Sequence, residues 1–538
     1  MCGIFAILNF QNKKYIRKIA IAQSKKMKHR GPDWSGYKIS NNNIFCHERL
    51  SIIDVFHGAQ PITSKNGKII LAVNGEIYNY KELKQEFDPE TFTTDSDCEV
   101  LIQLYQKYGT HFLDNVKILG MFAFILYDSE MDTYIIGRDH LGIIPLYMGY
   151  GEANEVYIAS EMKSLVELTK NIMVFPPAQF CVNGSNFYTF YQPHWKTQMV
   201  NIPFNTNELN TVLTNAVKSH LIADVDVGLL ISGGLDSSLI ASIAQKNSKK
   251  QLKSFCIGLE GSPDIAAAEK VADFIGTKHY SFYYTVQEGI DAIEDVIYHT
   301  ESCDVTTIRA STPMYLLARR IRALGIKCVL TGEVSDEISG SYAYFKYAPD
   351  SKEFYEETVR KVNDLYRYDL LRANKSMMAW SIETRVPFGD RDVVDYIMNL
   401  NPEFKMWSDI RMEKHYLRRA FSDGYLPEDM LWRKKEQFSD GVGYNWVDSL
   451  KEYAEQHVTD EQFNNAKTIF PTSTPTTKEA FLYREIFHKY FPHKSCIETL
   501  PYEKSVACST GTAMKWFAKN QIVDPSGRAV KGHSCSLK

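Results

Sequence analysis

One stretch of eight residues limits the fold of this chain more than any other: Ile231-Ser232-Gly233-Gly234-Leu235-Asp236-Ser237-Ser238. An apolar segment (225–231) predicts a buried strand leading into it, and a segment that predicts a helix (239–246) follows it. A strand, a glycine-rich loop and a helix N-terminus make an anion site, because the loop amides and the first helical N–H groups point to one place. The glycines permit close approach of a ligand, the three serines add hydroxyl donors, and Asp236 can hold Mg²⁺ beside a polyphosphate.

The loop is not a Walker A motif, which needs Gly-Lys-Ser/Thr after four spacer residues. It resembles the SGGxDS signature of the PP-loop ATP pyrophosphatases. That family grips the β- and γ-phosphates with this loop and cuts ATP to AMP and pyrophosphate, so the resemblance implies ATP as a substrate, together with Mg²⁺. The alternative interpretation is an ordinary Ser/Gly-rich turn.

Length and composition predict a two-domain cytoplasmic protein. The chain has 538 residues, more than one hydrophobic core usually organises. A net charge of −4 gives no reason to expect nucleic acid or an anionic membrane as a partner, and no apolar run is long enough to cross a bilayer. The N-terminal residues show no secretory signal, and the ten cysteines include no Cys-x-x-Cys pair, so we expect reduced thiols rather than disulfides or a zinc site.

The first 190 residues are strand-rich and form the first predicted domain. Short apolar runs predict strands at 4–8, 69–73, 121–127, 134–137 and 156–159. Helical periodicity appears at 16–27 and 99–108. The expected architecture is α+β, with sheets covered by helices.

Cys2 is the most informative residue of this domain. Methionine is normally removed when the following residue is small, so Cys2 should become the N-terminus. Its free α-amino group, with a pKa of roughly 7.7–8.0, can then take a proton from its own thiol near neutral pH. Nucleophile and base would reside in one residue. Taken alone, a cysteine at position 2 would be read as structural.

Four motifs that follow Cys2 change that interpretation: His-Arg-Gly-Pro-Asp at 29–33, His-Glu-Arg-Leu-Ser-Ile at 47–52, Asn-Gly-Glu-Ile-Tyr-Asn at 74–79 and Ser-Asp-Cys-Glu at 96–99. In this order and spacing they resemble the class II glutamine amidotransferases, over the whole first half of the chain. The resemblance implies an αββα N-terminal-nucleophile sandwich that hydrolyses glutamine. His29 and His47 have no metal-ligand spacing to a second donor, so we expect structural roles for them.

The chemistry of glutamine explains the residue types in these motifs. Arg49 offers a planar fork for the α-carboxylate, and Glu76 and Asp97 offer charge for the α-ammonium. The Asn74 side-chain amide and the Gly75 N–H can form an oxyanion hole, although Asn-Gly after a strand can also be a simple turn. In the family, backbone groups from Arg49 onward also line the pocket, here Leu50, Ser51, Ile52 and Ile53.

A proline-containing segment (191–208) is the predicted linker, and residues 209–538 alternate strands with helices. Strands are predicted at 225–231, 252–259, 280–284 and 326–330, and helices at 211–221, 239–246, 266–275 and 312–324, the last with Pro313 in its first turn. This pattern predicts an α/β domain with a parallel sheet, which binds ligands beyond the carboxyl ends of its strands.

A second motif follows the predicted strand at 326–330, at the carboxyl end of the sheet: Thr331-Gly332-Glu333-Val334-Ser335-Asp336-Glu337. Here the resemblance sharpens to the glutamine-hydrolysing asparagine synthetases, and segments 304–313, 385–388, 435–443 and 524–530 agree with it. The resemblance implies a two-step reaction. Aspartate attacks the α-phosphorus of ATP to give β-aspartyl-AMP and pyrophosphate, and ammonia from the first domain then displaces AMP.

The resemblance also implies residue roles in the second domain. Backbone at Ile231 and Ile257 would hold adenine, and Thr331 and Gly332 would contact the nucleotide. Asp236 and Asp336 would bind Mg²⁺ and pyrophosphate, Lys435 would neutralise charge on the phosphates, and Glu333 would act near the acyl-adenylate. Lys435 alone could equally be a surface lysine, and the sequence gives no strong reason for Arg372 and Asp369 as aspartate contacts. A homodimer is one expectation for the oligomeric state, which the sequence leaves open.

Two positions depart from the family pattern. The family has glycine where this chain has Val334, and usually leucine where it has Gly389. If the backbone φ at 334 is negative, the loop accommodates valine and the synthetase is intact. If φ is positive, valine is strained, and a displaced loop would weaken the synthetase. These departures leave a glutaminase-only relative as one alternative function. The other alternative is an amidotransferase of the same architecture that acts on a different carboxylic acid.

Overall fold

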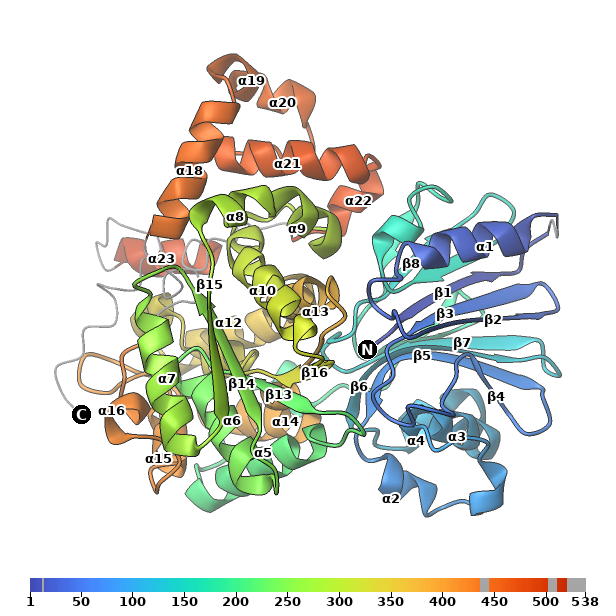
Figure 1. Cartoon of the computed structure of the whole chain (residues 1–538), viewed down its shortest axis with the longest axis horizontal. Helices are drawn as coiled ribbons and strands as arrows, with labels where there is room; N and C mark the ends of the chain where they lie inside the picture. The colour runs from blue at the N-terminus through green and yellow to red at the C-terminus, as the bar shows by residue number, and fades with distance from the viewer. Residues whose placement is uncertain (12–13, 436–444, 502–509, 520–538) are drawn as a thin grey trace.

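The computed structural model describes residues 1–11, 14–435, 445–501 and 510–519. Two domains lie side by side, and the N-terminus lies at the junction between them (Figure 1). Of the predicted motifs, most of 435–443 and all of 524–530 lie outside the described residues.

The first domain contains two six-stranded sheets packed face to face. The first sheet has the order β10 (Ile172–Val174), β8 (Tyr147–Tyr150), β9 (Val156–Ala159), β1 (Gly3–Leu8), β3 (Asn43–Arg49), β2 (Trp34–Ser40). The second has the order β12 (Asn186–Thr189), β11 (Gln179–Val182), β7 (Thr133–Arg138), β6 (Gly120–Asp128), β5 (Ile69–Ile77), β4 (Ile62–Thr63).

Helices cover the outer faces of both sheets. Helix α1 (Ile16–Lys25) packs on β1 and β3, while α2 (Tyr80–Lys84), α3 (Val100–Tyr108) and α4 (Phe112–Asn115) lie over the second sheet (Figure 1). The result is the expected αββα sandwich. All five predicted strands are present, but β5 extends to Ile77. Asn74 and Gly75 are therefore inside a strand, and the alternative of a simple turn at this pair is wrong.

The second domain is built on a five-stranded sheet whose neighbouring strands are all parallel. Its order is β15 (Lys278–Tyr283), β14 (Lys253–Gly258), β13 (Val227–Leu230), β16 (Cys328–Leu330), β17 (Glu383–Arg385). The helices around and beyond it are α5 (Thr206–His220), α6 (Leu235–Asn247), α7 (Pro263–Ile275), α8 (Val286–Asp291), α9 (Ile293–Thr300), α10 (Val305–Ala323), α11 (Ser335–Ser339), α12 (Ser351–Asp364), α13 (Asp369–Met378), α14 (Arg391–Asn399), α15 (His415–Ala420), α16 (Glu428–Leu431), α18 (Asn445–His457), α19 (Asp460–Asn464), α20 (Ala466–Ile469), α21 (Lys478–Tyr490), α22 (Lys494–Glu498), α23 (Gly511–Lys519).

One predicted helix start is wrong. Helix α10 begins at Val305, where the Asp304 side chain accepts from the Thr307 N–H at 2.8 Å, and Pro313 lies in the helix interior. Proline lacks the N–H that would bond the carbonyl four residues earlier. That carbonyl belongs to Arg309, and it accepts instead from the Trp446 indole N–H at 2.9 Å. A distant tryptophan thus satisfies the group that makes an internal proline costly.

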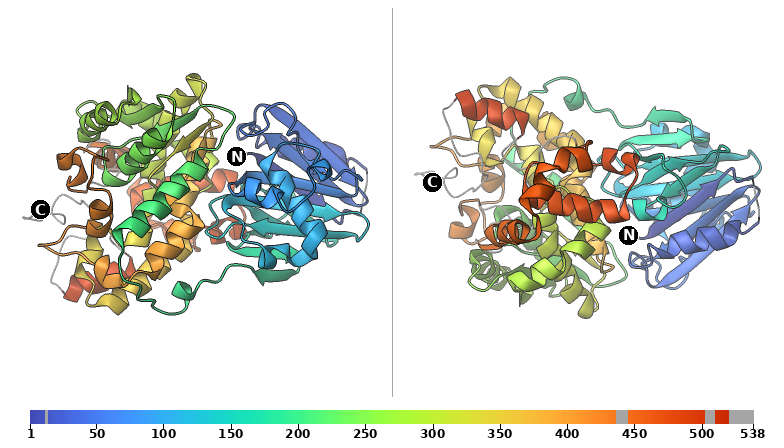
Figure 2. Two further views of the ribbon diagram at one scale, coloured as in Figure 1. Left: turned by 90° about the horizontal axis from the view of Figure 1, so that it is seen from below. Right: turned by 90° about the horizontal axis from the view of Figure 1, so that it is seen from above.

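The C-terminal helices lie across both domains. Figure 2 shows α21 and α22 reaching toward the first domain, where His493 contacts the Val166 carbonyl at 2.9 Å and Ser495 donates to the Lys170 carbonyl at 2.6 Å. Among the described residues, no helix combines the length and the apolar character needed to cross a membrane.

Candidate active sites

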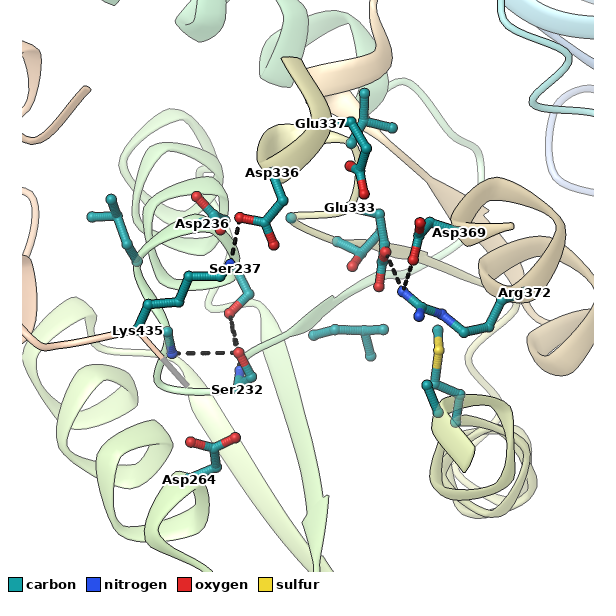
Figure 3. Close-up of a pocket in the computed structure, with 18 of the residues that line it drawn as sticks. Ser232, Asp236, Ser237, Asp264, Glu333, Asp336, Glu337, Asp369, Arg372 and Lys435 are labelled. Carbon is teal, nitrogen blue, oxygen red and sulfur yellow. Dashed lines mark hydrogen bonds and ion pairs between the residues drawn. The ribbon is translucent and has the colours of Figure 1, made fainter. Parts of the chain in front are cut away.

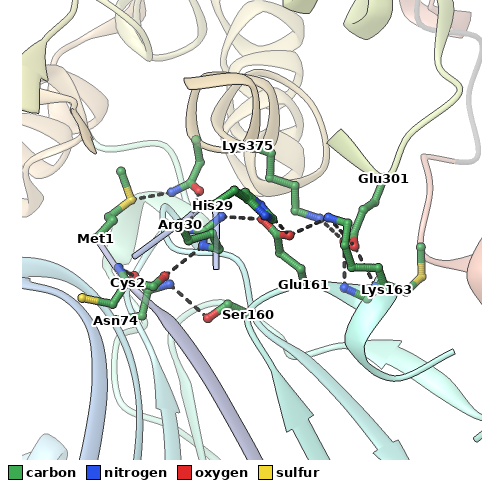
Figure 4. A network of polar contacts seen from close by, with 12 residues as sticks. Met1, Cys2, His29, Arg30, Asn74, Ser160, Glu161, Lys163, Glu301 and Lys375 are labelled. Carbon is green, nitrogen blue, oxygen red and sulfur yellow. Dashed lines mark hydrogen bonds and ion pairs between the residues drawn. The ribbon is translucent and has the colours of Figure 1, made fainter. Parts of the chain in front are cut away.

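Cys2 lies directly before β1, at the junction of the domains (Figure 4). Its backbone N–H donates to Asn74 Oδ1 at 2.6 Å, its carbonyl accepts from Arg30 Nε at 2.8 Å, and its Sγ lies 3.8 Å from the Leu50 carbonyl. The Met1 ammonium pairs with Glu383 of the second domain, and burial lowers its pKa. Three segments of the first domain therefore fix the backbone and thiol of Cys2.

Asn74 and Gly75 lie beside Cys2 on β5. The Asn74 amide nitrogen donates to Ser160 Oγ at 3.2 Å, which fixes the orientation of the side chain (Figure 4). Gly75 has a φ of +141°, and a Cβ at this position would lie 2.0 Å from the Met121 carbonyl oxygen across the β5–β6 pair. Only glycine fits here, because a side chain would force the two strands apart.

The other predicted glutamine-binding residues lie near the same end of β5. Arg49 donates to the carbonyls of Ile53 and Asp54 at 3.2 and 2.5 Å, so it orders the segment that follows β3. Within that segment, Ser51 N–H donates to Asp33 at 2.8 Å and the Ile52 carbonyl accepts from Asp224 N–H at 3.0 Å.

Two buried carboxyl groups face the end of β5. Asp97 accepts from the Ile77 N–H at 2.7 Å, and burial raises its pKa. Burial, with the nearby charge of Asp97, raises the pKa of Glu76 to about 8. Arg385, from β17 of the second domain, lies 3.5 Å from the Glu76 carboxylate and opposes this rise. A residue of the second domain thus contributes to the electrostatics of the predicted glutamine pocket.

A buried ionic network joins the domains next to Cys2 (Figure 4). Arg30 pairs with Glu161 at 2.8 Å, and Lys163 bridges Glu161 at 2.5 Å to Glu301 of the second domain at 3.2 Å. Glu301 also pairs with Lys375, and burial lowers the pKa of that lysine to about 8. The cost of burying these charges is offset only if every member keeps its partner, so the network fixes the relative position of the domains.

The histidines have the structural contacts expected of them. His29 lies 3.2 Å from Glu161, and His47 lies 2.8 Å from the Val73 carbonyl. Burial lowers the pKa of both rings, that of His47 to about 4.

The serine-glycine loop lies between β13 and α6, at the carboxyl end of the parallel sheet (Figure 3). Ser237 Oγ accepts from the Ser232 N–H at 3.0 Å, and Ser232 Oγ accepts from the Gly234 N–H at 3.3 Å. Gly233 has a φ of +72°, and a Cβ on it would lie 2.4 Å from the Ala267 Cβ on α7. Hydrogen bonds within the loop therefore fix its shape at a helix N-terminus, which is where an anion site can form.

A single pocket in the second domain brings most of the predicted ATP-site residues together. Its lining includes Ile231, Ser232, Gly234, Asp236, Ser237, Ile257, Thr331, Gly332, Glu333, Asp336 and Lys435. Gly233 and Ser238 are the exceptions, since they lie in the loop and the first turn of α6 without lining the pocket. Ile231 N–H donates to the Phe255 carbonyl at 3.0 Å, so that amide is engaged within the sheet.

Two lysines hold the two aspartates of the pocket, and Figure 3 shows one of them, Lys435, beside Asp336. Lys414 Nζ lies 2.6 Å from Asp236 and 2.5 Å from Asp336, and Lys435 Nζ lies 2.5 Å from Asp336. Although burial opposes it, these ammonium groups keep the pKa of Asp336 far below its usual value. Two carboxylates fit the demands of Mg²⁺, which takes one or two protein carboxylates and completes its shell with phosphate oxygens and water.

Glu333 lies at the other end of the pocket, next to a cation (Figure 3). Arg372 Nη2 pairs with Glu333 at 2.8 Å and with Asp369 at 2.9 Å, while Arg372 Nε has no partner among the described residues. Burial raises the pKa of Glu333 despite this arginine. The pocket thus offers a phosphate loop with lysines at one end and a carboxylate–guanidinium pair at the other.

The backbone of Val334 decides between the two alternatives for this position. Its φ is +79° and its ψ −24°, so the alternative of a negative φ is wrong. The loop nevertheless stays beside the phosphate loop, because Ser335 Oγ donates to Asp236 Oδ1 at 2.8 Å. A positive φ at residue 334 therefore coexists with an assembled pocket.

Sequence reasoning gave no role to four residues that these contacts single out: Arg30, Ser160, Arg385 and Lys414. Arg30 lies in the motif at 29–33 and Arg385 in the segment 385–388, so the sequence pattern could have indicated both residues. Ser160 and Lys414 stood in none, and Lys414 reaches Asp236 across 178 positions of the chain.

Comparison with known proteins agrees with this geometry. A glutamine amidotransferase domain model matches residues 1–194, and an asparagine synthase model matches residues 208–356 and 348–516. The chain is 51% identical to asparagine synthetase B (glutamine-hydrolysing) of Escherichia coli, with 100% of both chains covered. This chain belongs to the asparagine synthase family. Family relatives include glutamine-hydrolysing asparagine synthetases of Triphysaria versicolor, 48% identical over 99% of this chain and 94% of that one, and of Arabidopsis thaliana, 47% identical over 99% and 95%.

Proposed function

We propose that this chain synthesises asparagine from aspartate and ATP, using ammonia released from glutamine in its first domain. The observation that carries the proposal is the pocket of the second domain, where the phosphate loop and Lys435 lie opposite the Glu333–Arg372 pair. Full-length similarity to glutamine-hydrolysing asparagine synthetases supports the choice of substrates.

In the first domain, the backbone nitrogen of Cys2 donates a hydrogen bond to Asn74 Oδ1. Removal of Met1 would convert this nitrogen into the free α-amine of the chain. This amine takes the thiol proton, and Sγ attacks the side-chain carbonyl of glutamine. Asn74 and the Gly75 N–H stabilise the oxyanion, ammonia leaves, and water hydrolyses the remaining thioester to glutamate. Arg49 binds the substrate α-carboxylate, Glu76 and Asp97 bind its α-ammonium, and the backbone of Leu50, Ser51, Ile52 and Ile53 lines the pocket.

In the second domain, the phosphate loop holds the β- and γ-phosphates of ATP, and Ile231, Ile257, Thr331 and Gly332 contact the rest of the nucleotide. Arg372 orients aspartate so that its side-chain carboxylate attacks the α-phosphorus and pyrophosphate leaves. Lys414 and Lys435 stabilise the charge that develops on the leaving group. Glu333 accepts a proton when ammonia attacks the aspartyl carbonyl and AMP departs.

Asp236 and Asp336 are the carboxylates that would hold Mg²⁺, which when bound neutralises charge between the phosphates. Lys414 bridges the same two carboxylates, so its ammonium group lies close to where the phosphates would bind.

The test is a product assay on the purified chain with glutamine, ATP and one acid at a time. Aspartate should give asparagine, AMP, pyrophosphate and glutamate. AMP formation only with a different acid would identify an amidotransferase of another specificity. Glutamate without AMP under every condition would identify a glutaminase-only relative, and either result would overturn the proposal.

The Glu76 carboxyl predicts a pH dependence of glutamine binding. Its pKa of about 8 means that it is mostly protonated below that pH, and only the ionised form attracts the α-ammonium. We expect the KM for glutamine to fall as pH rises through about 8. Glu76→Gln should raise the KM at alkaline pH and remove this dependence. Glu82→Gln, an exposed glutamate on α2, is the matched control and should leave the profile unchanged. A Glu76→Gln profile like that of the wild type would contradict this role.

The proposal includes a cytoplasmic homodimer. The edge strand β2 exposes Trp34 by 56% and Ile39 by 46%, and apolar side chains on a sheet edge support self-association. Light scattering on the purified chain should give twice the mass of 61.7 kDa. A single-chain mass at micromolar concentration would overturn this part of the proposal and leave the reaction untouched.

A further inference from the structure

Val334 occupies a backbone conformation that valine rarely adopts. Its φ of +79° lies in the left-handed region, where a β-branched side chain crowds its own backbone. The residue is 1% exposed and lies directly before α11, with its carbonyl accepting from the Ile338 N–H at 3.2 Å. Such a conformation persists only where the surrounding structure holds it.

Gly389 lies next to the Val334 side chain. Its own φ is outside the left-handed region, so the backbone does not require glycine there. The space there is limited, because an added Cβ would lie 3.0 Å from Val386 Cγ2, 3.4 Å from Val334 Cγ2 and 3.7 Å from Ile143 Cδ1, so a larger side chain would push against these neighbours. The Gly389 carbonyl is held 2.9 Å from His140 of the first domain, so this residue cannot easily withdraw.

The two positions that depart from the family pattern are therefore in contact. One departure adds a side chain beside the catalytic loop, and the other removes a side chain from the wall that this loop packs against. We propose that Val334 and Gly389 form one packing unit that positions Glu333 for the synthetase reaction. The space above Gly389 receives the valine methyl groups, and this packing holds the loop at its positive φ.

The contacts on either side of Val334 explain why its position matters. Glu333 immediately before it pairs with Arg372 at 2.8 Å, and Ser335 immediately after it donates to Asp236 at 2.8 Å. A displaced residue 334 would move both the carboxylate near the acyl-adenylate and the contact to the phosphate loop. Misplacement of this kind, by about 1 Å, can cost about 10²-fold in rate. Val334 also lines the pocket, but its side chain packs next to Gly389, so its effect on the reaction runs through Glu333 and it is a positioning residue.

A double-mutant cycle tests the proposal, which rests on the proposed synthetase reaction. Pyrophosphate release is measured with aspartate, ATP and ammonium, so that the first domain is not needed. Gly389→Leu should lower kcat by at least about tenfold, because leucine displaces Val334. Val334→Gly should lower kcat by about three- to tenfold, because a flexible loop positions Glu333 less well. The double variant should return to within about threefold of the wild type, since leucine fills the space that valine leaves.

Further measurements and variants separate positioning from folding. Glutaminase activity should stay within about twofold of wild type in all variants, and the KM for ATP should change less than kcat. If Gly389→Leu does not fold, Gly389→Ala supplies the same cycle with a smaller effect. Gly511→Ala, where a Cβ has open space, is the matched control and should be silent.

The outcomes distinguish the two proposals. A wild-type chain that releases no pyrophosphate with aspartate would overturn the proposed function. A wild-type chain that does, combined with a double variant no better than Gly389→Leu alone, would overturn the packing unit and leave the function intact. A silent Gly389→Leu variant would also overturn it.

Discussion

Cys2→Ala should abolish glutamine hydrolysis and glutamine-dependent asparagine formation while ammonium-dependent synthesis continues. Removing a covalent nucleophile leaves only substrate binding and the oxyanion site, so a loss of at least about 10⁴-fold in kcat is expected. Synthesis from ammonium should stay within about twofold, because the aspartate and ATP site lies in the other domain and has its own groups. Coupled assays of glutamate and pyrophosphate on the same preparation measure both activities.

Two further measurements make this result specific to the thiol. Intact-mass analysis should show that Met1 is absent from both the wild type and the variant, because the α-amine is part of the proposed mechanism. Cys46→Ala removes another buried cysteine of the same domain, whose pKa burial raises to about 12, and should preserve hydrolysis. Near wild-type hydrolysis by Cys2→Ala, or a loss shared equally by both variants, would rule out the N-terminal nucleophile.

Much of the fold can be predicted from the sequence, because the apolar residues of its strands and helices recur with the spacing typical of each element. Each predicted strand of the first domain is present, and the loop at Ser232 joins a strand to a helix as expected. The errors arose where distant residues decide. Pro313 could be read only as a helix start, because the Trp446 indole that satisfies the Arg309 carbonyl comes from 137 positions away.

The candidate sites show the same limit. Motifs predicted Cys2, Glu333 and Lys435 because their neighbours in sequence carry recognisable patterns. Nothing adjacent to Lys414 in sequence indicates that it bridges Asp236 and Asp336, since tertiary packing alone brings it there. The contact of Val334 with Gly389 was equally invisible, and each residue by itself looked like a defect.

Lys435→Ala should remove most ATP-dependent pyrophosphate release and leave glutaminase activity unchanged. Lys435 Nζ lies 2.5 Å from Asp336 at the mouth of the phosphate loop, so it can follow the charge that develops on the leaving pyrophosphate. Losing one pre-positioned contact of this kind costs about 10²–10³-fold in kcat. Asp236→Ala should give a loss of similar size, because it removes a carboxylate proposed to hold Mg²⁺ and the partner of Ser335.

The neighbouring lysine supplies the control for charge alone. Lys434→Ala removes the same charge from the neighbouring residue, which lines the pocket but is exposed, and should change kcat by no more than about threefold, because solvent screens an exposed charge. Lys414→Ala should resemble Lys435→Ala in rate, but it should also lower thermal stability, since it leaves two half-buried carboxylates near each other without the cation that they share. Equal losses for Lys434→Ala and Lys435→Ala would mean that the segment acts only through its total charge. Full pyrophosphate release by Lys435→Ala would contradict the role of Lys435 and would indicate that Lys414 is the lysine that stabilises the phosphates.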